Sequence, residues 1–217
     1  MKKFSEKYVI GLTGNIATGK SVVRKMLERL GAYGIDADEL GHRAMAKDAP
    51  GYQQIIDTFS TTILKEDGNI DRNALGRIVF TDAYALKQLE TIVHPLVRHA
   101  IEMLAQHIPH SIIVIEAIKL IEGELFTLCD SIWVVNASQE TRLSRLMLKR
   151  NLSAADANLR LHSQPPQEQK IAVADVIIQN EGSFSDVWQQ VTTAWKKINP
   201  KYKDSPARIT LILSLNG

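Results

Sequence analysis

The chain of 217 residues has a single cysteine, Cys129, no long hydrophobic run and a net charge of only +2. One cysteine excludes an internal disulfide and any metal site built from several cysteines. A membrane-spanning helix needs roughly 18 consecutive apolar residues, and the apolar run after Met1-Lys2-Lys3 is too short even for a signal peptide. The small net charge gives no general argument for nucleic-acid binding. We therefore expect a cytoplasmic protein that acts on small molecules, with neither nucleic acid nor a membrane as partner.

The chain is organised around a glycine-rich loop between a predicted strand and a predicted helix. Tyr8 to Leu12 form an apolar run typical of a buried strand, and residues 14–21 match the pattern G-x-x-x-x-G-K-[ST]. Apolar residues from Val22 to Leu30 then recur at helical spacing, and Gly31 is placed to cap that helix. The alternative is a glycine-rich turn with a solvated lysine. The flanking strand and helix favour a nucleoside-triphosphate site instead.

The residue types of this loop suit a phosphate ligand. Gly14 and Gly19 permit positive φ angles and a close approach of the backbone to phosphate. Successive amides and the N-terminus of the following helix form a concave anion site. Lys20 is expected to reach the β- and γ-phosphates, and the Ser21 hydroxyl to ligate Mg²⁺. The expected triphosphate-binding residues are Gly14, Asn15, Ile16, Ala17, Thr18, Gly19, Lys20 and Ser21.

Two carboxylates follow a short second strand, predicted for residues 32–35. The carboxyl ends of the strands in an open parallel sheet face the ligand crevice. Asp36 and Asp38 are therefore candidates to hold Mg²⁺ through water or to accept a proton from a hydroxyl group. The alternative for one of the two is that it caps the helix that follows, as Asp38 would before Glu39-Leu40.

Residues 39–108 read as helical, without a convincing central strand. Asp71 is the expected N-cap of a helix that begins at Arg72. A later helix is predicted to end near Val93, because the residue before Pro95 avoids the helical region, and a new one to run over residues 96–106. An all-helical block between the strands of an α/β pattern suggests an inserted substrate domain.

Buried strands are also predicted for residues 111–115, 132–135 and 176–178. Glu116 follows the first of these, where a carboxylate could bind Mg²⁺ or substrate; a buried structural role is an equal alternative. Residues 184–198 read as the closing helix, whose tryptophans are expected to be core anchors. The roles of the tail, residues 199–217, are left open.

Residues 141–173 form a predicted helical hairpin that carries several basic residues, Arg142, Arg145, Lys149 and Arg150 among them. Most charge runs are solvated surface, and that alternative stands here. In a protein with a phosphate loop, however, a cationic lid would neutralise charge on the transferring phosphoryl group and exclude water. We favour the lid, because phosphoryl transfer needs more positive charge than the loop supplies.

In this order, the motifs resemble those of the dephospho-coenzyme A kinase family, over roughly residues 9–195. The phosphate loop alone is common to many kinases and ATPases, and its combination with the other motifs is much more specific. The residues on which the resemblance rests are Ile10–Gly14 leading into the loop, Ile35–Asp38, Ile70–Arg72 with Leu75 and Phe80, His94–Leu96, Arg145-Leu146, Ser163-Gln164, Ala174-Asp175 and Asn180–Gly182.

The resemblance implies transfer of the ATP γ-phosphoryl group to the ribose 3′-hydroxyl of dephospho-coenzyme A, with ATP and Mg²⁺ as cofactors. It makes Asp38 the leading candidate for the base, with Asp36 supporting it or the metal, and Lys20 and Arg150 as further catalytic residues. Metal ligands would be Ser21 and Asp36. Further ATP contacts would be Arg145, Lys149 and Asn180. Acceptor contacts would be Arg72, Leu75, Phe80, His94, Arg98, Glu116 and Lys119.

The chain departs from the family pattern at several positions. Asn15 replaces a second glycine, and asparagine tolerates positive φ. Ile118-Lys119 stands where the family has proline and leucine, Lys149 replaces arginine, Arg150 replaces aspartate, and Pro165 replaces methionine. Lysine cannot reproduce the bidentate contact of a guanidinium group.

The predicted fold is α/β: a P-loop kinase with a parallel central sheet flanked by helices, a helical substrate-binding insertion and a helical lid. The predicted segments are core (1–38), acceptor domain (39–108), core (109–140), lid (141–173), core (174–198) and tail (199–217). Alternatives are another nucleoside or nucleotide kinase, or a catalytically weakened P-loop protein. A GTP switch is disfavoured, because the chain has no Asn-Lys pair to begin an N-K-x-D motif.

Overall fold

The computed structural model describes residue 4, residues 6–198 and residues 200–202. These residues divide into two compact units. Unit 2 comprises residues 36–106, and unit 1 comprises the chain before and after it. Most of the predicted tail, residues 199–217, lies outside the described part. The six-segment division drawn from the sequence stays a prediction.

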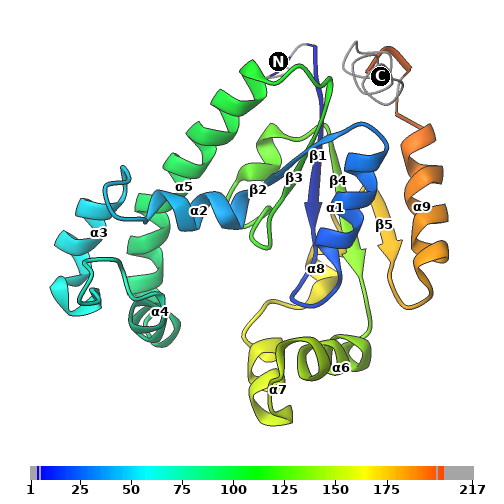
Figure 1. Ribbon diagram of the computed structural model, residues 1–217. Coiled ribbons are helices and arrows are strands. Elements are labelled where there is room, and N and C mark those ends of the chain that lie inside the picture. Colours follow the sequence, from blue (N-terminus) through cyan, green and yellow to red (C-terminus); the bar gives the residue numbers. More distant parts are fainter. Residues whose placement is uncertain (1–3, 5, 199, 203–217) are drawn as a thin grey trace, which may run out of the picture. The chain divides into compact units, whose positions relative to one another are not determined.

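The described part of unit 1 is built on one five-stranded sheet (Figure 1). Its strands are β1 (Tyr8–Thr13), β2 (Tyr33–Asp36), β3 (Ile112–Glu116), β4 (Ser131–Asn136) and β5 (Val176–Gln179). The strand order is β2-β3-β1-β4-β5, and β1 pairs in parallel with both β3 and β4, as β4 does with β5. Continuous burial along β1 and β3 is typical of parallel strands covered on both faces. The predicted α/β class with a parallel sheet is confirmed.

Helices α1 (Lys20–Arg29) and α9 (Phe184–Lys196) contribute the apolar side chains that pack on this sheet. Val23 and Leu27 of α1 lie in one core cluster with Trp133 of β4 and with Val191 and Trp195 of α9. The expectation that Trp195 is a core anchor is confirmed. This packing fixes the start of α1, and hence the phosphate loop, at the carboxyl end of β1.

Three helices lie between β4 and β5 in the sequence: α6 (Gln139–Arg150), α7 (Ala154–His162) and α8 (Gln167–Ile171). Ser138 and Ser153 cap the first two, because their side chains accept hydrogen bonds from amides at the start of each helix. Leu146, Ala157 and Leu161 form the buried contact of the α6–α7 hairpin. A short 3₁₀ helix, Leu125–Leu128, precedes β4, and another, Pro200–Tyr202, follows α9.

Unit 2 contains α2 (Ala37–Ala44), α3 (Tyr52–Phe59), α4 (Arg72–Thr81) and most of α5 (Ala83–His107), with a 3₁₀ helix at Thr61–Ile63. Asp71 accepts a hydrogen bond from the Asn73 amide at 2.8 Å, so the predicted N-cap is confirmed. The predicted interruption at Pro95 is wrong, since α5 runs through it. A proline removes one helical hydrogen bond, and burial of Ile92, Val97 and Ile101 along the same helix outweighs that loss.

None of the described helices combines the length and the apolar composition that a membrane crossing requires.

Candidate active site

The phosphate loop connects β1 to α1 and has positive φ angles at three residues. They are 146° at Gly14, 63° at Ala17 and 95° at Gly19. A side chain at Gly14 would collide with the Val135 carbonyl oxygen, and one at Gly19 with the Asn180 amide. The prediction that both glycines take positive φ angles is therefore confirmed. Asn15 itself does not take a positive φ angle; the third residue of the loop that does is Ala17.

Lys20 is the first residue of α1, and its side chain is buried against the loop. The Nζ atom donates to the carbonyl oxygens of Gly14 at 2.9 Å and Asn15 at 3.3 Å. The helix has no acidic residue in its first turn, and its N-cap, Gly19, provides no side-chain acceptor. The positive end of the helix dipole therefore lies beside a buried ammonium group, an arrangement suited to an anion.

Side chains from α6 and from the end of β5 bind the outer carbonyl groups of the loop. Arg142 Nε donates to the Ile16 carbonyl at 3.2 Å. Arg145 donates to the carbonyls of Ala17 and Thr18, both at 3.2 Å, and to that of Asn180 at 2.7 Å. Burial lowers the pKa of Arg142 below its usual range, against the opposing charge of Glu168. Arg142 and Arg145, two of the basic residues predicted for a lid, therefore donate hydrogen bonds to the backbone of the phosphate loop.

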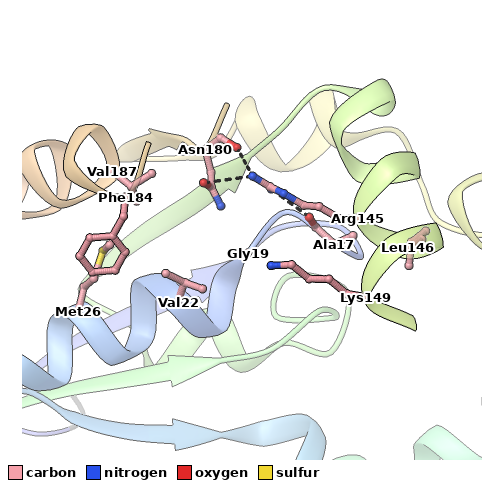
Figure 2. A pocket seen from close by; sticks show the side chains of 10 residues that line it. All are labelled: Ala17, Gly19, Val22, Met26, Arg145, Leu146, Lys149, Asn180, Phe184 and Val187. Atoms are coloured by element: carbon pink, nitrogen blue, oxygen red, sulfur yellow. Dashed lines mark hydrogen bonds between the residues drawn. The ribbon is translucent and has the colours of Figure 1, made fainter. Parts of the chain in front are cut away.

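Asn180 strengthens the same arrangement from the end of β5. Its Nδ2 donates to the Thr18 carbonyl at 2.7 Å, and its Oδ1 accepts from Arg145 at 3.3 Å. Figure 2 shows Asn180 and Arg145 side by side above the loop. The predicted nucleotide-binding residues Gly19, Arg145 and Asn180 are therefore neighbours in the structure.

A pocket of about 300 Å³ adjoins this part of the loop (Figure 2). The cationic side chains of Arg145 and Lys149 lie at one end, and apolar side chains lie at the other. The lining residues are Ala17, Gly19, Val22, Met26, Arg145, Leu146, Lys149, Asn180, Phe184 and Val187. An apolar recess next to a phosphate loop can receive a flat heterocyclic base while the loop holds the phosphates.

Ser21 and Glu116 meet on the other side of the loop. Ser21 Oγ donates to Glu116 Oε1 at 2.7 Å, and Arg24 Nε donates to Glu116 Oε2 at 2.7 Å. Glu116 is only 4% exposed. Arg24 also binds Glu28 at 2.6 Å. Burial lowers the pKa of Arg24, but the hydrogen bonds and charges of Glu116 and Glu28 outweigh it and raise that pKa above its usual range.

The donor set formed by Ser21 and Glu116 fits a hard divalent cation. A hydroxyl oxygen and a carboxylate oxygen within 2.7 Å of each other are ligands of the type that Mg²⁺ prefers. Among the described residues, no group of three or more His, Cys, Asp or Glu side chains is placed to hold a metal. Mg²⁺ sites in proteins commonly combine one or two protein ligands with water and substrate phosphates.

Asp36 and Asp38 have different environments within unit 2. Asp36 Oδ1 accepts from the Glu39 amide at 3.0 Å and caps α2, so the predicted helix cap exists, but the capping residue is Asp36 and not Asp38. Asp38 lies in the first turn of α2 and is exposed.

The predicted acceptor contacts of unit 2 are partly surface residues. Phe80 is 82% exposed, and Leu75 is 3% exposed within the core of the unit, where its role is packing. Arg72 lies 2.9 Å from His42 Nε2. His94 and Arg98 lie on α5, where Arg98 pairs with Glu102 at 3.0 Å.

The remaining predicted residues belong to unit 1. Lys119 is exposed on the segment after β3, and Glu116 binds Ser21 and Arg24. Arg150 ends α6, and its side chain lies outside the described part of the structure.

Sequence reasoning missed two groups of residues at this site. The first is the apolar wall of the pocket, from α1 and α9, which follows from the helical spacing once the two helices are known to face each other. The second is Gln164 and Gln167, whose side chains accept hydrogen bonds from the loop amides of Ile16 and Asn15. Gln164 was part of a family motif without an assigned role, and nothing in the pattern distinguished Gln167.

Comparison with known proteins identifies the family. The sequence model of the dephospho-CoA kinase family matches residues 8–186. The dephospho-CoA kinase of Carboxydothermus hydrogenoformans is 41% identical over 199 residues, which cover 90% of this chain and 96% of that protein.

Solved structures agree. A dephospho-CoA kinase from Campylobacter jejuni matches with a TM-score of 0.63 at 32% identity, covering 88% of this chain and 97% of that one. A crystal structure from Thermus thermophilus matches with a TM-score of 0.79 at 29% identity, covering 90% and 100%. The predicted resemblance is confirmed, and the chain belongs to the dephospho-CoA kinase family of ATP-dependent phosphotransferases.

Proposed function

We propose that this chain transfers the γ-phosphoryl group of ATP to the ribose 3′-hydroxyl of dephospho-coenzyme A, giving coenzyme A and ADP. The observation that carries the proposal is the phosphate loop adjoining a pocket of about 300 Å³ with an apolar end and a cationic end. The triphosphate lies on the loop amides, and the adenine lies among Val22, Met26 and Phe184. The cytoplasm, where ATP is abundant, is the proposed location.

Lys20 and Lys149 supply positive charge to the donor. Lys20 is bound to loop carbonyls, and on nucleotide binding its Nζ exchanges these neutral partners for β- and γ-phosphate oxygens. Lys149 is an exposed residue at the cationic end of the pocket, and it reaches the phosphates as a point charge. Arg145 acts through the loop, because its guanidinium group binds loop carbonyls. Arg150, on the same helix, is proposed as a further cation toward the transferring group.

Mg²⁺ is the proposed metal, held by the Ser21 hydroxyl with Glu116 beside it. When bound, it neutralises charge on the β- and γ-phosphate oxygens. Glu116 accepts from the Ser21 hydroxyl and so orients the oxygen that faces the metal. Arg24 Nε donates a second hydrogen bond to Glu116, at its other carboxylate oxygen. Asp36 is proposed as a further, water-mediated ligand, as the family resemblance implies.

Asp38 is the proposed general base, on the resemblance of Ile35–Asp38 to the family motif. Its carboxylate is exposed, hence open to an incoming hydroxyl, and accepts the proton as the hydroxyl oxygen attacks the γ-phosphorus in line with the leaving ADP. The acceptor lies on unit 2 against Arg72, Phe80, His94 and Arg98. The exposure of the Phe80 ring supports a stacking or apolar contact with it. Lys119 is proposed to contact its phosphates.

The decisive experiment measures the product. Purified protein with ATP, Mg²⁺ and dephospho-coenzyme A is expected to form coenzyme A and ADP, separated by chromatography, with adenosine and nucleoside monophosphates as poor acceptors. If one of these is the far better acceptor, the enzyme is a different nucleotide kinase. If no acceptor is phosphorylated although ATP binds, the chain is a catalytically weakened member of the family.

Two substitutions test the assigned roles. Asp38→Asn is expected to lower kcat about 100-fold or more while leaving ATP affinity unchanged, because it removes only the proton acceptor. Asp48→Asn, at an exposed carboxylate of the same unit, is the matched control and is expected to retain activity. Lys20→Ala is expected to lower both kcat and ATP affinity. An active Asp38→Asn enzyme would remove Asp38 from the mechanism.

A further inference from the structure

The first two amides of the phosphate loop are bound by side chains from a distant segment. The Asn15 amide donates to Gln167 Oε1 at 2.8 Å, and the Ile16 amide donates to Gln164 Oε1 at 2.7 Å. The Asn15 side chain returns a bond from its Nδ2 to the Pro165 carbonyl at 2.8 Å. Three hydrogen bonds thus join two loop residues to residues 164–167, which comprise the end of the connection between α7 and α8 and the first residue of α8.

Gln167 is a buried bridge between the loop and the sheet. It is 6% exposed, and its Nε2 donates to the Val135 carbonyl on β4 at 2.9 Å. Both ends of the amide are therefore paired, as a buried polar group requires. Since β4 is a central strand of the sheet, its carbonyl is a fixed reference point. The Gln167 side chain therefore links the Asn15 amide to β4 and fixes its position relative to that strand.

The segment that carries the glutamines has an anchor of its own. Lys170 of α8 is 2% exposed, and its Nζ donates to the Ile118 carbonyl at 2.8 Å and to Glu122 Oε1 at 2.7 Å. These contacts lie on the segment after β3 and do not involve the loop. The Lys170 contacts therefore fix α8, next to the glutamines, independently of the phosphate loop.

The hydrogen bonds to the phosphate loop restrict the conformation in which the loop binds the phosphate donor. The carbonyl groups of residues 16–18 are bound from α6 and Asn180, and the amides of residues 15 and 16 are bound by the glutamines. With these polar groups paired, and with the Thr18 amide bound to the Asn15 carbonyl at 3.4 Å, the loop is held in the turn from which the following amides form the proposed anion site. A loop held in its binding conformation before the ligand arrives loses less conformational entropy on binding.

We propose that Gln167 and Gln164 are positioning residues of the donor site, which hold the phosphate loop in its triphosphate-binding conformation. The proposal rests on the proposed function, because it takes the loop to be where the ATP phosphates bind. Neither glutamine touches the nucleotide; each acts through a loop amide. Their removal therefore weakens nucleotide binding and leaves the acceptor's KM unchanged.

The test compares Gln167→Met with Gln169→Met. Both positions lie on α8, but Gln169 is exposed, so its substitution controls for changes to the helix itself. ATP and ADP binding are measured by calorimetry, well below the melting temperature of each variant, and hydrogen exchange is followed for the peptide that contains residues 14–21. For Gln167→Met we expect roughly 10-fold weaker binding and faster exchange in that peptide, with the acceptor's KM as in the wild type. For Gln169→Met we expect neither change.

The outcomes are distinguishable. If the wild-type chain does not bind ATP, the proposed donor site itself is wrong. If it binds ATP and the folded Gln167→Met variant binds equally well, the glutamine proposal is overturned. A lower melting temperature with unchanged affinity would mean that Gln167 only stabilises the fold, which also overturns it. If Gln167→Met does not fold, Gln164→Met decides, because Gln164 is only half-buried; we expect about threefold weaker nucleotide binding.

Discussion

Replacing Glu116 by glutamine removes the negative charge at the end of β3 without changing the size of the side chain. In the wild-type protein this carboxylate accepts from Ser21 and from Arg24, each at 2.7 Å. The Arg24 side chain is 18% exposed, so its charge depends on nearby carboxylates for compensation. After the substitution Arg24 keeps Glu28 at 2.6 Å, but it faces a neutral amide where Glu116 was.

The expected loss of unfolding free energy is about 2–3 kcal/mol. A hydrogen bond to a charged group contributes about 1.5–3 kcal/mol, and breaking a buried ion pair costs about 3–5 kcal/mol. The lower part of these ranges applies here, since Arg24 retains Glu28 and some solvent contact. Glu28→Gln is the matched control. Its side chain is 34% exposed, so we expect a loss below about 1 kcal/mol.

Urea unfolding followed by tryptophan fluorescence measures this loss in the relevant unit. The chain has three tryptophans, at positions 133, 188 and 195, and all belong to unit 1 with Glu116. Arg24→Met and the double variant complete a cycle, in which we expect a coupling energy of at least about 1 kcal/mol. If Glu116→Gln unfolds within about 0.5 kcal/mol of the wild type, the buried pair does not stabilise the protein and our reasoning about it fails.

Three further predictions concern the same unit. Gly11→Ala is expected to lower stability by about 1–3 kcal/mol, measured as a lower Tm, because the new methyl carbon would lie 2.7 Å from Cys129 Sγ in a packed interior. The Cys129 thiol is expected to resist alkylation at pH 8 in the folded protein, as mass spectrometry would show, since burial raises its pKa to about 12. The hydrogen bond from Thr141, with those from Ser138, lowers the pKa of Glu181. The ionised Glu181 carboxylate stabilises the folded state, and this effect is complete above pH 4.5 and is lost as the pH falls through the lower pKa of the folded state. Glu181→Gln is therefore expected to make the decrease of Tm at acid pH less steep.

Each of these has an outcome that contradicts it. An unchanged Tm for Gly11→Ala would mean that β1 shifts to accommodate the methyl group. Rapid alkylation of Cys129 without unfolding would mean that the thiol is accessible. An acid limb that is the same in Glu181→Gln as in the wild type would mean that this carboxylate is not preferentially stabilised in the folded state.

The sequence was most informative where a pattern is local. The strand–loop–helix unit around Gly14 to Ser21 was predicted because three adjacent signals agree: an apolar run, the glycine spacing and a helical period. The Asp71 cap was predicted for the same reason, from one residue and the helix after it. The helix break at Pro95 was wrong because a local rule met a longer-range effect, namely the burial of one face of α5.

The remaining features of the site depend on contacts between distant parts of the chain. Gln167 is 152 residues from Asn15, and Arg145 is 128 residues from Ala17. No spacing rule connects such pairs, because they meet only after β4 and β5 have taken their places beside β1. For that reason the sequence does not predict that Arg142 and Arg145 of α6 bind the loop, and the lid stays a prediction.

The distribution of these contacts explains how a strained residue is held within the loop. A residue such as Ala17, with a φ of 63°, costs of order 1 kcal/mol or more and persists only where its surroundings determine it. Arg145 binds the Ala17 carbonyl, Arg142 the carbonyl before it and Asn180 the one after it. Side-chain hydrogen bonds of this kind, each worth about 0.5–1.5 kcal/mol, together exceed the strain. The conformation of the phosphate loop is therefore determined by its contacts with α6 and Asn180.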